Sequence, residues 1–196
     1  MNREAVLTKK YLSGGAAKAI GIQSNALARW VDRGLVRPSS PTAGGSGTRN
    51  EYTLNDIVRI GIMKALGTRS FTWGRASDLA FQSPVESEYG KMLDEAITKS
   101  LDAWMYHRSD QRKNMLAEWA GSEITQEDEA MLDATNKPEP SYFFFLQDES
   151  GKVYASRSQN AKDFGTLYKD LETVESASLV NLSAIIDKVM CVLAGC

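Results

Sequence analysis

The chain has 196 residues, 42% of them hydrophobic, which is enough to build the core of one domain or of two small ones. No apolar run approaches the roughly 18 residues that a membrane-spanning helix needs, and the N-terminus lacks the apolar stretch of a signal peptide, so we expect a cytoplasmic protein. The two cysteines, Cys191 and Cys196, lie five residues apart near the C-terminus, so a disulfide bond between them could not stabilise a fold of this size. This excludes a disulfide framework.

The formal net charge of −2 conceals an uneven distribution. Residues 1–75 carry 12 Lys and Arg against 4 Asp and Glu, a balance of +8, whereas residues 76–196 carry 11 against 21, a balance of −10. Such a split suggests a polyanion-binding head joined to an acidic body. Basic surface also occurs without a nucleic-acid partner, so charge alone leaves both interpretations open.

The first predicted elements are two short helices. One runs from Ser13, a candidate N-cap, to Ile20, and Gly21 follows where a left-handed residue is favoured. The second covers about residues 24–33 and is stopped by Gly34. Its inward side is apolar at spacings of three and four, at Ala26, Leu27, Trp30 and Val31. Two short helices joined by a glycine turn predict a helix-turn-helix, whose second helix has the right size for the DNA major groove.

Residues 37–49 are rich in Pro, Gly, Ser and Thr, which predicts a loop. Such a composition is typical of an interdomain linker, but a helix follows at once: Thr53 and Asp56 have the spacing of a capping box. That helix has a broad apolar stripe formed by Leu54, Ile57, Val58, Gly61, Ile62, Ala65 and Leu66. A basic, flexible loop between two helices of one small core is typical of a DNA-binding wing.

Further helices are predicted beyond Gly67. A short one carries Phe71, Trp73, Ala76, Leu79 and Ala80, and a longer amphipathic helix runs from Ser83–Pro84 to about Tyr106. Its apolar stripe follows a period of 3.6 rather than a heptad, so it packs either in a globular core or in a bundle-like dimer interface. Residues 110–120 and 126–134 are weaker helix candidates.

The period then changes to that of extended chain. Residues 142–146 and 152–156 predict a β-hairpin, followed by a helix near 163–171, a strand at 178–182 and a last helix at 183–193. The expected fold is mainly α with a small α+β C-terminal part. We divide it into a winged helix-turn-helix domain at 1–82 and an acidic dimerisation or effector domain at 83–196.

Residues 15–66 resemble the N-terminal domain of the MerR family of bacterial transcription regulators. The features that correspond, in order, are Ala17, Gly21, Leu27, Trp30, Gly34-Leu35-Val36, Pro38, the glycine-rich wing, Arg49, Tyr52 and Asp56. The family usually has Arg directly after the leucine of its second helix, where this chain has Ala28 and places arginine next, at Arg29. A shift of one residue turns a helical side chain by about 100°. Arg49 and Tyr52 are also one residue further apart than usual.

The outward side chains of the second helix predict the DNA contacts. Asn25 and Arg29 have the chemistry to read adenine or guanine, whereas Ser24 and Arg33 suit phosphate. Arg37 and Arg49 flank the wing, expected over 37–52, and are expected to neutralise backbone charge on the phosphates or in the minor groove; Lys18 adds to the basic field. With the tyrosine of the resemblance, the candidate DNA-binding residues are Lys18, Ser24, Asn25, Arg29, Arg33, Arg37, Arg49 and Tyr52.

The resemblance implies a sequence-specific regulator of transcription that binds double-stranded DNA as a homodimer, in a bacterium or phage and associated with the nucleoid. An architectural or packaging role, as in phage excisionases or small terminase subunits, is the alternative. An enzyme with a DNA-targeting head is a third possibility, but one His and two C-terminal cysteines leave no plausible nucleophile and base pair, and no phosphate-binding GxxxxGK[ST] loop is present.

We therefore expect no enzyme activity, no cofactor and no metal site. His107, Cys191 and Cys196 are interpreted as structural or incidental, and Asp94-Glu95 as solvated surface. A small-molecule effector is possible but not identified. The aromatic residues of the acidic body suit either an effector pocket or an ordinary core: Trp104, Tyr106, Trp119, Tyr142 to Phe145 and Tyr154.

Overall fold

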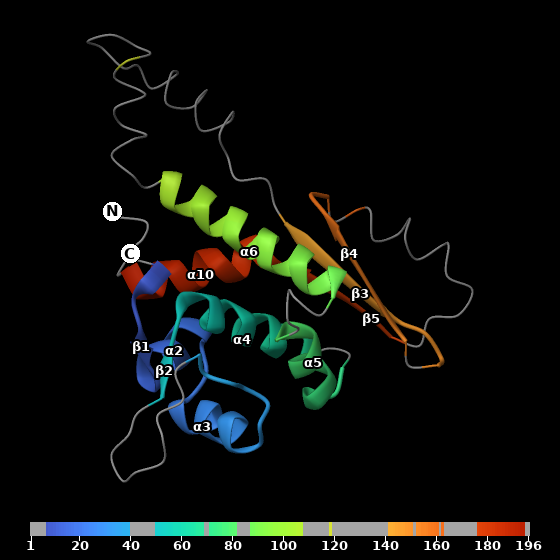
Figure 1. Cartoon of the computed structure of the whole chain (residues 1–196), viewed down its shortest axis with the longest axis horizontal. Helices are drawn as coiled ribbons and strands as arrows, with labels where there is room; N and C mark the ends of the chain where they lie inside the picture. Colours follow the sequence, from blue (N-terminus) through green and yellow to red (C-terminus); the bar gives the residue numbers. More distant parts are fainter. Residues whose placement is uncertain are drawn as a thin grey trace.

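The structure is a computed structural model that describes residues 7–39, 50–68, 71–81, 87–107, 118, 141–150, 152–160, 162 and 176–194. It is mainly helical, with a small antiparallel sheet in the C-terminal part (Figure 1). This confirms the predicted fold class. No helix in the described ranges is both long enough and apolar enough to span a bilayer.

The N-terminal elements form the predicted pair of short helices. Strand β1 (Tyr11–Leu12) leads directly into α2 (Ser13–Ile20), which is followed by α3 (Ser24–Asp32). Gly21 has φ 67°, and the amide of Ile22 donates to the carbonyl of Ala17, so the left-handed turn is confirmed. Ser13 is not the N-cap: it is the first helical residue, because the extended backbone of β1 continues through Leu12 to the start of the helix.

Two further helices complete this N-terminal part. Strand β2 (Glu51–Tyr52) pairs antiparallel with β1 and precedes α4 (Leu54–Gly67), and α5 (Trp73–Ala80) follows. The capping box is confirmed: the Thr53 hydroxyl accepts from the amide of Asp56, and the Asp56 carboxylate accepts from the amide of Thr53. Ten of the fourteen residues of α4 are buried, which makes it the central helix of the molecule.

The C-terminal part combines two helices with three strands. Helix α6 (Glu88–His107) precedes β3 (Tyr142–Gln147), β4 (Val153–Ser158) and β5 (Ser176–Asn181), and α10 (Leu182–Ala194) follows. The strands lie in the order β4-β3-β5, all antiparallel, which confirms the predicted hairpin and the later strand. The helices predicted at 110–120, 126–134 and 163–171 lie outside the described residues, apart from position 118.

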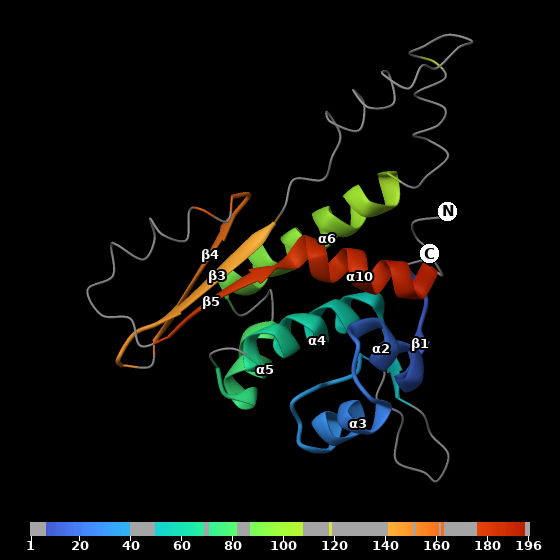
Figure 2. The same cartoon turned by 180° about the vertical axis from the view of Figure 1, so that it is seen from behind.

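The hydrophobic core is continuous between the two parts. Figures 1 and 2 show α10 lying between α6 on one side and α2 and α4 on the other, and it packs against all three helices. The contact with α4 is close, since a Cβ atom on Gly61 would come within 2.8 Å of the Ile185 side chain. The domain boundary predicted near residue 82 falls among residues that the structure does not describe.

The apolar stripe of α6 packs inside the same chain. Its buried residues belong to the common core and are Leu93, Ala96, Ile97, Leu101, Trp104 and Met105. The indole of Trp104 donates to Asp187 of α10 at 3.1 Å, and the ring of Tyr89 packs edge-on against Phe143 and Phe145 of β3. Of the two arrangements that the stripe allowed, the structure has the globular core.

Candidate nucleic-acid interface

Helix α3 presents a polar face away from the core. Leu27 is fully buried beneath it, while the exposed positions are Ser24, Asn25, Ala28, Arg29 and Asp32, with Arg33 at the C-cap. Residues 25, 28, 29 and 32 follow spacings of three and four and therefore share one side of the helix. This side carries an amide, a methyl group and a guanidinium, which are groups that read base edges in a major groove.

The end of α3 is held rigidly by α5. The rings of Trp30 and Trp73 pack with their centroids 5.0 Å apart. Gly34 adopts a left-handed backbone with φ 70°, and the amide of Leu35 donates to the carbonyl of Trp30 at 2.9 Å. The Leu35 carbonyl in turn accepts a hydrogen bond from the hydroxyl of Ser77 on α5. The orientation of the exposed face is therefore fixed by packing and backbone hydrogen bonds rather than by the loop that follows.

Arg29 and Arg33 come together at one edge of this face. They line a shallow groove of about 200 Å³ together with Ala26, Trp30 and Trp73. From the sequence alone, Arg29 is expected to read a base and Arg33 to hold a phosphate. Their common groove brings two positive charges together beside the exposed face, an arrangement that suits a polyanion.

The start of the wing segment is anchored by a buried carboxylate. Ser39 donates to Asp56 from its hydroxyl at 2.7 Å and from its amide at 3.3 Å. The same carboxylate accepts from the amide of Thr53, so Asp56 joins Ser39, at the start of the predicted wing, to the start of α4. Arg37 is exposed just before this anchor. Arg49 and the rest of residues 40–49 lie outside the described residues.

Tyr52 does not occupy the position expected of a DNA contact. Its side chain is 0% exposed, and its backbone on β2 pairs in register with Tyr11 of β1. Burial raises the pKa of the Tyr52 phenol. We therefore interpret Tyr52 as part of the core that supports the wing. Lys18, by contrast, is exposed on α2, as a contribution to the basic field requires.

The structure adds a lysine that the sequence analysis did not single out. The ammonium of Lys64 on α4 donates to the carbonyls of Ile20 and Gly21, at 2.9 and 3.1 Å. It therefore supplies hydrogen bonds to carbonyl groups at the C-terminal end of α2 and in the turn that follows. Burial, and to a smaller extent the charge of Lys188, lowers the pKa of this group. No local pattern links a lysine to a turn more than forty residues earlier in the chain.

Asp94 is also more than solvated surface. It pairs with Arg59, a buried arginine of α4, at 2.9 Å. Arg59 further donates to the carbonyl of Ala80 at the end of α5. The pair therefore ties α4, α5 and α6 together. The interpretation of Asp94 as merely solubilising was wrong, because sequence alone does not show that a charge from a distant helix faces it.

The described residues contain no group of three or more potential metal ligands. Cys191 is a half-buried thiol on α10 that donates to the Asp187 carboxylate at 3.9 Å. Trp104 and Phe143 to Phe145 are buried, whereas Tyr154 is exposed on β4. The Tyr106 and His107 side chains, Trp119 and Cys196 lie outside what the structure describes.

Residues 11–80 match a family model described as MerR HTH family regulatory protein. No curated protein matches the chain. The matched segment runs from β1 to the end of α5, and so includes the helix-turn-helix, the wing segment, α4 and α5. Residues 11–80 of this chain are therefore a MerR-like helix-turn-helix domain.

Proposed function

We propose that this protein is a transcription regulator that binds double-stranded DNA sequence-specifically, with α3 in the major groove and the wing segment 37–52 on the backbone or in the minor groove. The observation that carries the proposal is the exposed face of α3, whose side chains have the chemistry to read bases and which packs against α5. The family match of residues 11–80 and the positive balance of residues 1–75 agree with it.

Each exposed residue has a role in this arrangement. Asn25 and Arg29 read base edges, and the Ala28 methyl group suits contact with a thymine methyl. Ser24 and Arg33 hold phosphates at the two ends of the helix, and Arg37, Arg49 and Lys18 neutralise further backbone charge. Asp32, on the same face, is a hydrogen-bond acceptor for a cytosine amino group and repels a phosphate placed there.

We further propose that the protein acts as a homodimer on a pseudo-palindromic site, because one nine-residue helix contacts too few bases for selective binding. The apolar face of α6 is already covered within the chain, so the contact between subunits uses another surface. Light scattering at micromolar concentration tests this point. A strict monomer, both free and on DNA, contradicts the dimer.

The main test is a selection of bound sequences from random double-stranded DNA with the full-length protein. We expect enrichment of one motif with two related half-sites. The Arg29→Ala variant should relax the motif at one base position in each half. No enrichment above the starting pool, at low salt and micromolar protein, would falsify the proposal.

Footprinting on genomic DNA then separates regulation from the architectural alternative. Sites next to promoters support regulation of transcription. Sites confined to a phage attachment or packaging locus would instead assign the protein to the excisionase-like or terminase-like class.

A further inference from the structure

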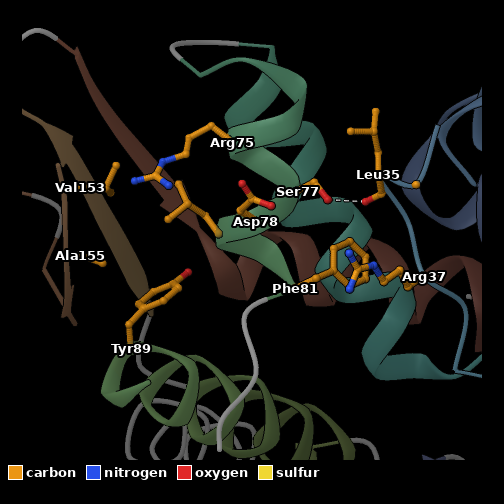
Figure 3. Close-up of a pocket in the computed structure, with 11 residues that line it drawn as sticks. Leu35, Arg37, Arg75, Ser77, Asp78, Phe81, Tyr89, Val153 and Ala155 are labelled. Carbon is orange, nitrogen blue, oxygen red and sulfur yellow. Dashed lines mark hydrogen bonds between the residues drawn. The ribbon is translucent and has the colours of Figure 1, made fainter. Parts of the chain in front are cut away.

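A cavity of about 520 Å³ lies where the DNA-binding part meets the sheet (Figure 3). One wall is the segment that follows α3, with Leu35 and Arg37, and a second is α5 with Arg75 and Asp78. Tyr89 of α6 and the β4 residues Val153 and Ala155 complete it. The volume is in the range of small-molecule sites, and the walls come from segments that are distant in the sequence.

The hydroxyl of Tyr89 is the first sign of a ligand. The oxygen is buried and has no hydrogen-bond partner among the described residues. The ring is held edge-on by Phe143 and Phe145, with centroids 6.3 and 5.8 Å away, so it cannot turn aside easily to reach water. Figure 3 shows the hydroxyl directed toward the α5 side of the cavity. A buried polar group without a partner is costly, and a bound molecule would supply the missing hydrogen bond.

The charges around the cavity restrict what that molecule is. Figure 3 shows the guanidinium groups of Arg37 and Arg75 on opposite sides of the cavity, with Asp78 between them. The exposed guanidinium of Arg37 favours a planar carboxylate, and the carboxylate of Asp78 repels an anion and accepts from a hydroxyl or amine. Burial raises the pKa of Tyr89, so its phenol stays neutral and can donate. The other lining residues include the apolar side chains of Leu79, Phe81, Val153 and Ala155, and Ser77, whose hydroxyl already donates to the Leu35 carbonyl.

We propose that this cavity binds a small carboxylic acid with an apolar body and a hydroxyl or amino group, and that the bound acid weakens DNA binding. The carboxylate lies with Arg37, the donor group faces Asp78, and the hydroxyl of Tyr89 completes the hydrogen bonding. The claim that the acid weakens DNA binding rests on the proposed DNA-binding function. The claim that the cavity binds the acid is independent of that function.

The effect on DNA follows from Arg37. This residue lines the cavity and is also one of the exposed arginines assigned to the DNA backbone. A carboxylate that engages Arg37 competes with a phosphate for the same guanidinium. Because coupling between two binding sites is reciprocal, DNA must weaken binding of the acid by the same factor.

Binding of the acid is tested first, without DNA, by calorimetry on the full-length protein. The probes are para-hydroxybenzoate and para-aminobenzoate, each compared with its neutral amide, at concentrations up to about 10 mM. We expect both acids to bind and the amides to bind at least tenfold more weakly, since an amide loses the charge-assisted contact with arginine. Failure of both acids to bind overturns the proposal.

Tyr89→Phe identifies the site. It removes only the unpartnered oxygen, and we expect it to weaken binding of the acids about fivefold, the usual effect of one lost hydrogen bond. Tyr154→Phe is the matched control: its hydroxyl bonds to Asp148 and its exposed ring lies outside the cavity lining. Equal loss in both variants, or no loss in Tyr89→Phe, places the acid elsewhere and overturns the assignment. Arg37→Gln is a second variant and should weaken binding of the acids but not of the amides.

The effect on DNA is measured last, by titrating the selected DNA site with and without para-hydroxybenzoate. We expect DNA affinity to fall several-fold and the salt slope to fall by about one unit, as for the loss of one phosphate contact. Tyr89→Phe should bind DNA normally without the acid and need more acid for the same effect. Calorimetric binding with unchanged DNA affinity overturns the coupling alone. A protein that binds no DNA refutes the proposed function, and the calorimetry still decides the site.

Discussion

Removing the carboxylate of Asp94 should destabilise the whole fold, although Asp94 lies on the surface side of α6. Arg59 has a side chain only 8% exposed and relies on Asp94, with a side chain 39% exposed, as its charged partner. A hydrogen bond to a charged group contributes roughly 1.5–3 kcal/mol, and partial exposure of Asp94 reduces that figure through solvent screening. The amide of Asn55 also donates to the same carboxylate, at 3.3 Å. We expect Asp94→Ala to lower the free energy of unfolding by about 2 kcal/mol.

The neighbouring residue provides a matched control. Glu95 pairs with Lys99 at 3.9 Å, and both side chains are 68% exposed, so Glu95→Ala should cost at most about 0.5 kcal/mol. Urea unfolding of both variants, followed by circular dichroism, gives the two values from shifts of the midpoint at constant slope. In 1 M salt the small effect of Glu95→Ala should vanish while most of the Asp94→Ala effect remains. Similar losses for the two variants would refute the role assigned to the buried arginine.

Two other predictions concern the DNA contacts and the packing of the glycines. Arg33→Ala should weaken binding to all DNA sequences alike and lower the salt slope by about one unit, whereas Arg29→Ala should alter base preference; filter binding over a salt series, with matched and mismatched sites, distinguishes the two. A Cβ atom on Gly67 would lie 2.5 Å from the ring of Trp73, so Gly67→Ala should lower the free energy of unfolding by about 1–3 kcal/mol. A Cβ atom on Gly74 would meet nothing within 4 Å, so Gly74→Ala should raise the free energy of unfolding by roughly 0.5 kcal/mol. If thermal unfolding finds Gly67→Ala more stable than Gly74→Ala, the packing described is contradicted.

Features whose causes are local could be predicted from the sequence. The left-handed Gly21 and the capping box of Thr53 and Asp56 each depend on residues within one turn, and both have the expected geometry. The hairpin of β3 and β4 likewise depends on an aromatic run at residues 142–146 and a turn at Asp148. The glycine turn and the capping box therefore predict the helix-turn-helix and the start of α4 from local sequence alone.

Features that depend on tertiary contacts could not be predicted. The apolar stripe of α6 predicts that this face packs against another element. In the structure α10 packs there, about eighty residues later in the chain, and the spacing of residues within α6 does not identify that helix. A tyrosine side chain can lie either at the surface or in the core, so the sequence does not predict the burial of Tyr52. Its side chain is buried in the structure, where β2 pairs with β1. The pairing of Arg59 with Asp94 and the cavity beside Tyr89 arise only when the two halves of the chain meet.

The packing of α10 on α2 and α4 has a consequence for synthesis on the ribosome. Ile20 and Gly61 belong to the N-terminal part, yet the side chain that covers Gly61 is Ile185. While the chain is being made, this apolar patch stays open to solvent until α10 has left the exit tunnel. The nascent protein is therefore a candidate client for chaperones, and truncation before α10 should favour aggregation over a free DNA-binding fragment.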